Sequence, residues 1–233
     1  METRGVAFPG RAVAILAIAL AASACASAGR AGLSVSGRAA LNGMIYDCES
    51  RPVADAEISV DGEPSARSDV NGRFSLGEMR FGTYALGVSK PGFERTAFTL
   101  RYSEATQIIY IKARSAKQLL DAAEKEAEKR NWAQALGFLD RIDAIGDRDP
   151  LARYLRAVVR ARQGETRESR AILESLLAED YDEPYVHLFL ADLLQYSLTD
   201  ANAAIGHLEK YLKSRYDPEA EKRLQELRAA EAR

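Results

Sequence analysis

The feature that most constrains this chain is a 34-residue period in its C-terminal half. Three acid–proline pairs share it: Asp149-Pro150, Glu183-Pro184 and Asp217-Pro218. Successive prolines lie 34 residues apart, and alanines at positions 123, 157 and 191 keep the same interval. A unit of this length that holds two helices cannot bury its apolar face alone, so neighbouring units must stack. The period therefore predicts an α-α superhelical repeat array over residues 114–217.

This segment resembles three tetratricopeptide repeats. The second helices are expected in "RNWAQALGFLDRI", "GETRESRAILESLL" and "TDANAAIGHLEKYL". Small residues are expected where these helices cross their partners closely: Ala135, Ser169 and Ala203 or Ala204. Residues 218–233 are polar and predict a C-terminal capping helix over the last apolar face.

The composition changes near Ala113, and the preceding region is predicted to be β-structure. Short alternating runs are separated by the turn signals "DGEP", "DVNG" and "KPG". The strand-like runs are Leu41–Asp47, Ala56–Val60, Arg73–Leu76, Thr83–Ser89, Thr96–Tyr102 and Gln107–Lys112. Together they predict a small antiparallel β-sandwich over residues 39–113, with Gly72 at a turn that requires positive φ. The fold class is thus multidomain, β followed by α.

The β region resembles the carboxypeptidase regulatory-like domain, a transthyretin-like sandwich. The matching points are Gly43, Ile45, Asp47, Pro52, Val53, Ala56, Val60, Asp69, Gly72, Phe74, Gly82, Tyr84, Val88, Gly92 and Phe93. The resemblance implies a module that accompanies catalytic domains and carries no zinc ligands or general base itself.

Two sets of residues in the β region have alternative interpretations. The aspartates at positions 47, 61 and 69 lack the regular spacing of a calcium loop, so we expect them to form turns. Tyr46, Tyr84 and Phe93 are expected in the sandwich core, with sugar binding as the alternative.

Residues 1–24 have the composition of an export signal. Arg4 and Arg11 precede an apolar run from Ala12 to Ala24, which is shorter than the ~20 residues that cross a hydrocarbon core. A basic start, a short apolar core and small residues at the exit are typical of a secretory signal peptide. A buried helix is the alternative, but the run has no polar face and no capping residue at its start.

Ala22-Ser23-Ala24-Cys25 resembles the lipobox of bacterial lipoproteins, with Ala22 where that family usually has leucine. The resemblance implies a diacylglyceryl group on Cys25 and a lipid-attached flexible tether over residues 25–38. The next two residues, Ala26-Ser27, contain no aspartate, which by the same resemblance implies the outer membrane, facing the periplasm. The "ASA" also permits ordinary signal-peptidase cleavage and simple secretion.

Charge and motif content exclude several classes of function. The chain has 32 basic and 34 acidic residues, and no segment is strongly basic, so we expect no nucleic-acid partner. With lipid on Cys25, Cys48 has no disulfide partner in the chain. No G-x-S-x-G, phosphate-binding glycine loop or zinc ligand set occurs. We therefore expect that this chain is not an enzyme, and that it has no cofactor and no small-molecule substrate.

Charged stripes on the first helices of the array are candidate groove residues. In residues 151–162, apolar side chains follow i, i+3, i+4 spacing, and Arg153, Arg156 and Arg160 gather on the opposite side. In the preceding repeat, Asp121, Glu124 and Glu128 lie largely away from the apolar residues. These charged residues either form a solvated, partly self-paired surface, at ~0–1 kcal/mol per exposed pair, or select an extended segment of a partner.

The third unit, "EPYVHLFLADLLQY", is apolar almost all round. Such a helix is either buried on most sides or presents an apolar patch to a partner. His187, Leu188 and Gln195 are candidate groove residues. We expect no metal at His187, because the chain's other histidine, His207, falls on a different helix.

These observations predict a membrane-anchored adaptor in the cell envelope whose repeat array binds another envelope protein. The alternative is a module whose β-sandwich binds a cell-wall glycan.

Overall fold

The computed structural model describes residues 37–231. The predicted signal peptide, the lipobox and nearly all of the tether lie outside this range. None of the described helices is both long enough and apolar enough to cross a membrane.

The described chain begins with seven β-strands. They are β1 (Arg38–Tyr46), β2 (Glu57–Val60), β3 (Glu63–Arg67), β4 (Arg73–Arg80), β5 (Gly82–Ser89), β6 (Thr96–Tyr102) and β7 (Ile108–Lys112). One sheet has the order β4-β1-β7 and the other has the order β3-β2-β5-β6. Inward-facing side chains of both sheets, among them Leu41, Ile45, Ile58 and Leu86, form a single buried core.

Strand β3 is not expected from the sequence, because its first two residues, Glu63 and Pro64, belong to the turn signal "DGEP". Asp61 and Gly62 both have positive φ and close a β2–β3 hairpin. All but one of the residues of β3 are exposed, so the strand has no apolar alternation by which it can be recognised.

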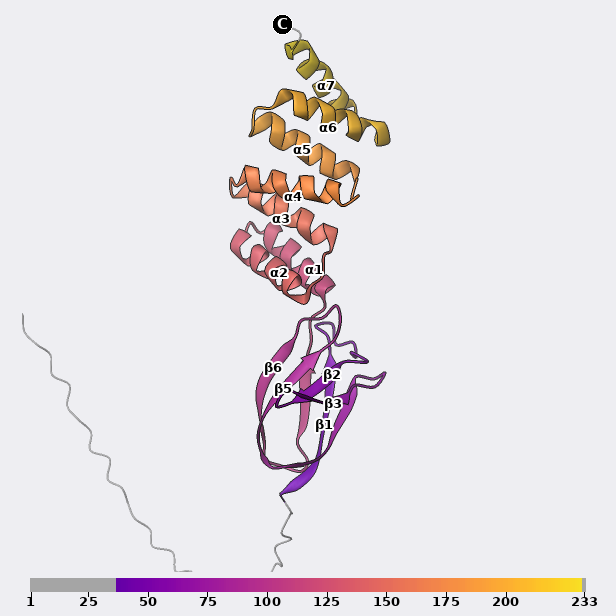
Figure 1. Ribbon diagram of the computed structural model, residues 1–233, viewed down its shortest axis with the longest axis vertical. Helices are drawn as coiled ribbons and strands as arrows, with labels where there is room; N and C mark the ends of the chain where they lie inside the picture. Colours follow the sequence, from indigo (N-terminus) through magenta and orange to yellow (C-terminus); the bar gives the residue numbers. More distant parts are fainter. Residues whose placement is uncertain (1–36, 232–233) are drawn as a thin grey trace, which may run out of the picture. The chain divides into compact units, whose positions relative to one another are not determined.

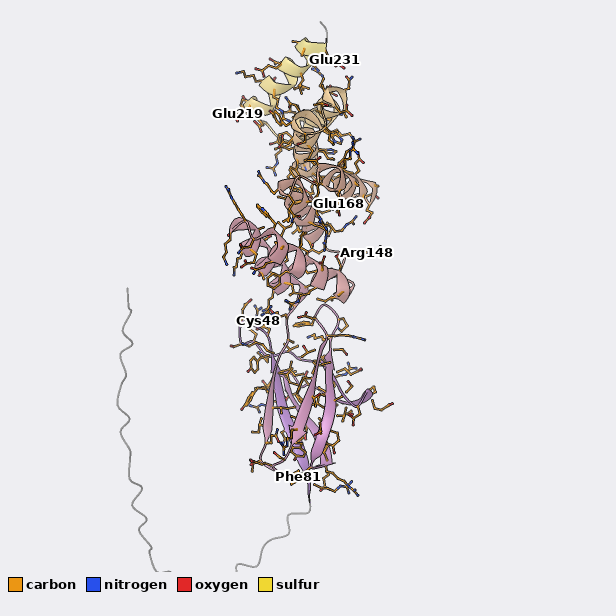
Figure 2. The ribbon with its side chains drawn as sticks, turned by 90° about the vertical axis from the view of Figure 1, so that its left-hand side faces the viewer. Cys48, Phe81, Arg148, Glu168, Glu219 and Glu231 are labelled. Atoms are coloured by element: carbon orange, nitrogen blue, oxygen red, sulfur yellow. The ribbon has the colours of Figure 1, made fainter. Side chains whose placement is uncertain are left out.

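The pairing of β1 with β7 is parallel, whereas every other strand pair of the described sheets is antiparallel. Arg38, at the start of β1, lies opposite Arg80, and Tyr46, at its end, lies opposite Lys112. The chain therefore enters this domain at one end of β1 and leaves it at the other. Cys48 and Phe81 mark these two ends in Figure 2.

Seven helices follow. They are α1 (Ala116–Glu128), α2 (Trp132–Ile145), α3 (Pro150–Arg162), α4 (Thr166–Ala178), α5 (Pro184–Tyr196), α6 (Ala201–Ser214) and α7 (Pro218–Glu231). The recurrent prolines are the first residues of α3, α5 and α7, where proline is tolerated because its missing N–H has no helical partner. In α3 the preceding acid caps the helix, since Asp149 accepts a hydrogen bond from the Leu151 N–H.

The helices form a tetratricopeptide-like array, as the period predicts. The most extensive helix contacts join α1 to α2, α3 to α4 and α5 to α6, and less extensive contacts join each of these pairs to the next helix (Figure 1). Ala135, Ser169 and Ala204 are fully buried at the crossings. Ser169 Oγ also donates a hydrogen bond of 2.7 Å to the carbonyl of Ala157. The terminal helix α7 covers the α5–α6 pair with Ala220 and Leu224.

Candidate functional site

A hollow of about 680 Å³ lies between the first helices of the first two repeats. Its apolar lining consists of Ala127 on α1, Trp132 at the start of α2, and Leu155 and Val158 on α3. All four side chains are half-buried. The hollow forms because Leu155 and Val158, three residues apart, share the face of α3 that is turned toward α1.

Four charged side chains complete this lining: Glu124 and Glu128 on α1, Arg130 after it, and Arg162 on α3. All four residues are exposed. None of them takes part in an ion pair within the described part of the chain. The hollow therefore presents both signs of charge around an apolar floor.

The three predicted groove arginines of α3 point elsewhere and are paired within the array. Arg156 bonds Asp140 and Asp143 of α2, both at 2.7 Å. Arg153 and Arg160 instead reach the α4 side, where their partners are Glu179, Glu165 and Glu168; Figure 2 labels Glu168. Their side chains are only 15–26% exposed. The arginines are therefore paired within the array, but with acidic residues of α2 and around α4 and not with those of α1. A partner-binding role for these arginines stays a prediction.

The expectation that His187 faces an open groove is wrong. His187 is only 3% exposed, because α5 packs along α6 and this side chain points toward His207. The two Nδ1 atoms are 2.8 Å apart, and His187 Nε2 lies 2.5 Å from the Asp182 carboxylate. A consistent set of hydrogen bonds has His187 donating to Asp182 through Nε2, and His207 donating to the His187 Nδ1 lone pair. Burial, with smaller effects from His187 and Lys210, lowers the pKa of His207 to about 4.

His187 and His207 lie on different helices, as the sequence predicts, but their rings meet between α5 and α6, so their separation along the chain does not by itself argue against a shared metal. Within residues 37–231, no group of three or more metal-ligating side chains is gathered in one place.

Leu188 and Gln195, the other two candidates on α5, face the C-terminal end of the array. Leu188 is half-buried and packs against a cluster that contains Leu208 and Leu224. Gln195 accepts a hydrogen bond from the Arg223 guanidinium of α7, which also pairs with Asp192 at 2.6 Å. The predicted site residues therefore lie in separate parts of the array and do not form one site.

In the β-sandwich, the aspartates form turns as expected. Asp47 accepts hydrogen bonds from the backbone N–H groups of residues 49 and 51, and Asp69 accepts them from residues 71 and 73. Asp61 accepts one from the N–H of Ala85.

The prediction that three aromatic residues belong to the core is right for two of them. Tyr84 and Phe93 pack against the core. Tyr46 does not, because it follows the inward-facing Ile45 and therefore points out of the β4-β1-β7 sheet.

The residues around the α1–α3 hollow were not recognised from the sequence as one site. Val158 and Arg162 occupy the positions of Glu124 and Glu128 one period later. Aligning the repeats with a shift of 34 residues pairs Glu124 with Val158 and Glu128 with Arg162. This alignment is the sequence signal that predicts these four side chains close together.

Comparisons with known proteins give the following matches. Residues 40–111 match the family model of the carboxypeptidase regulatory-like domain, and no curated protein matches the chain. The first TPR domain of Spaghetti (RPAP3), bound to an HSP90 peptide, is 15% identical over 51% of this chain and 94% of that one, with a TM-score of 0.46. The Yersinia enterocolitica type III secretion chaperone SycD, in complex with a YopD peptide, is 14% identical over 49% and 89%, with a TM-score of 0.42. The Thermus thermophilus TPR protein TTC0263 is 23% identical over 48% of this chain and 59% of that one, with a TM-score of 0.37.

Proposed function

We propose that this chain is a protein-interaction scaffold of the cell envelope, and that its helical array binds an extended segment of another envelope protein. The observation that carries the proposal is the hollow between α1 and α3. Its volume of about 680 Å³ lies in the range that accommodates ligand groups in proteins, ~300–1,000 Å³. We assign this hollow a binding role.

The lining also indicates the chemistry of the bound segment. Leu155, Val158 and Trp132 offer an apolar floor for an aliphatic or aromatic side chain. Glu124 and Glu128 favour a cationic neighbour, whereas Arg130 and Arg162 favour an anionic one. Charge complementarity of this kind contributes specificity and association rate more than affinity. We infer a segment with an apolar anchor between residues of opposite charge.

Site-directed photo-crosslinking in the native host tests this proposal. A photo-reactive residue in place of Ala127, inside the hollow, should capture a discrete envelope protein. The same residue at Gly137, an exposed position on α2 with open space around it, should not capture that protein. Equal capture from both positions would contradict the assigned surface.

Charge reversal tests the lining itself. The double substitution Glu124→Lys and Glu128→Lys should weaken the affinity for the captured partner at least about tenfold, because like charges across an interface repel. The matched control is Glu63→Lys with Glu104→Lys, which makes the same charge change at exposed positions of the β-sandwich. Binding that survives the first pair as well as the second overturns the hollow as the binding site. Reversal of Arg153, Arg156 and Arg160 is a poorer test, since it breaks ion pairs within the array.

We further propose that the chain is held at a membrane by lipid on Cys25, in the outer membrane and facing the periplasm. The support comes from the sequence: an apolar export signal ends in the lipobox-like Ala22-Ser23-Ala24-Cys25. Stable attachment needs more than one acyl chain, and the modification implied by this resemblance supplies several.

The anchor is tested by fractionating cells that express cysteine variants. Cys25→Ser, still exported, should move from the membrane fraction to the soluble fraction. Cys48→Ser should stay with the membrane, because Cys48 is a free, exposed cysteine of the folded domain. If Cys25→Ser sediments with membranes as strongly as the parent chain, the anchor is excluded.

A further inference from the structure

The outer face of the β4-β1-β7 sheet carries an unusual number of large apolar side chains. Met44 and Tyr46 of β1 point outward beside Ile108 and Tyr110 of β7. Ile108 is 55% exposed and Tyr110 is 64% exposed. Solvent-facing sides of such sheets are normally polar, and a contiguous exposed apolar patch marks a binding surface.

The two tyrosines form a platform on this face. Their ring centroids are 6.4 Å apart and the rings are tilted by 53°. A tyrosine ring combines an apolar face with a polar hydroxyl, which suits ligands that have both a flat apolar side and many hydroxyl groups. Pyranose sugar rings have this character.

A hollow of about 510 Å³ adjoins the platform. Besides Met44 and Tyr46, its lining includes the side chains of Ser50, Asn71, Arg73 and Lys112. The hydroxyl and amide groups can donate and accept hydrogen bonds, as sugar hydroxyls require. The only charged side chains in the lining are cationic, and neither forms an ion pair within the described residues.

We infer that this sheet face is a binding site for an anionic glycan, in which pyranose rings stack on Tyr46 and Tyr110 and a carboxylate pairs with Arg73 and Lys112. The guanidinium group fits a carboxylate through two parallel hydrogen bonds. The site is independent of the α1–α3 hollow, so each can fail without the other.

Other occupants fit the face less well. A membrane surface would have to be reached at the Tyr46 end of β1, whereas the chain enters the domain at the Arg38 end, eight residues away. A second copy of this chain would bring Arg73 and Lys112 of both copies into one interface, where like charges repel.

Calorimetric titration of the purified full-length chain tests the inference, with hexagalacturonate as the anionic glycan and maltohexaose as the neutral one. We expect saturable binding of hexagalacturonate and at least about fivefold weaker binding of maltohexaose. Tyr110→Ala should raise the Kd for hexagalacturonate at least about fivefold, since it removes one stacking ring. Lys112→Gln should raise it about threefold or more, because a charge-assisted hydrogen bond is lost. Tyr216→Ala, at a site 89% exposed and outside the sheet, should leave it unchanged.

The site is overturned if the parent chain shows no saturable binding, or if the parent and Tyr110→Ala have equal Kd values for hexagalacturonate. Full displacement of hexagalacturonate by an equal concentration of inorganic phosphate would also overturn it. So would a dimer of the parent chain that Tyr110→Ala dissociates. Binding of the Cys25→Ser chain to vesicles of one part phosphatidylglycerol and three parts phosphatidylcholine, abolished by Tyr110→Ala, would likewise assign the face to lipid instead.

Discussion

Alanine in place of Gly72 should destabilise the β-sandwich by about 2–5 kcal/mol. Gly72 has a φ of +73°, a conformation that costs an L-residue ~1–2 kcal/mol. An added Cβ would also lie 2.3 Å from the carbonyl oxygen of Ile45. That oxygen belongs to the backbone of β1, and Ile45 N–H already donates to the Gly72 carbonyl at 2.7 Å. The strand cannot move away without breaking this bond, so overpacking adds a further ~1–3 kcal/mol.

Chemical denaturation followed by circular dichroism measures this loss, and Gly62→Ala is the matched control. Gly62 also has positive φ, but open space surrounds the position where its Cβ would stand. Its substitution should cost only the conformational part, about 1–2 kcal/mol. Equal losses for the two variants would show that the contact with β1 contributes nothing.

Acidification from pH 7 to pH 5 should destabilise the α5–α6 pair by about 1–2 kcal/mol. The pKa of His207 falls from 6.5 to about 4 in the folded chain, with burial as the main cause. The unfolded chain therefore binds the proton more readily, and stability present above pH 6.5 is lost as the pH falls toward 4. Lys210 and Arg170 oppose the charged imidazole, whereas Glu174 favours it.

The measurement is the urea midpoint of the parent chain and of His207→Gln at both pH values. The variant cannot take up a proton at this position, so its midpoint should change less between pH 7 and pH 5 than that of the parent. The same pH dependence in both chains would exclude His207 as its source. His187, which contacts His207 directly, and its partner Asp182 stay unchanged in this comparison.

Sequence reasoning predicts the array well because the 34-residue period recurs along the chain. The proline at the first position of α3, α5 and α7 also follows from a rule that acts within one helical turn. It failed for β3, whose residues are mostly exposed and are held by their pairing with β2. Pairing between strands is a tertiary contact that leaves no periodic trace in an exposed segment.

The binding surfaces were harder to predict than the elements that carry them. Helical periodicity predicts that Arg153, Arg156 and Arg160 lie on the side opposite the apolar stripe. It cannot predict that acidic residues of α2 and at the two ends of α4 lie next to them. The sequence predicts His187 as a groove residue because it falls on the less apolar side of its helix. Its partners, Asp182 and His207, satisfy its ring nitrogens in the interior instead. Such placements depend on which helix packs beside which.

The parallel pairing of β1 with β7 gives the β-sandwich a mechanical property. Its points of attachment stand at opposite ends of a strand of nine residues, which at ~3.3 Å per residue amounts to ~30 Å. An antiparallel pairing would have returned the chain to its starting end. The domain therefore acts as a rigid spacer, and for a chain fastened ahead of Arg38 it adds ~30 Å to the farthest distance that α1 can reach from the fastening point.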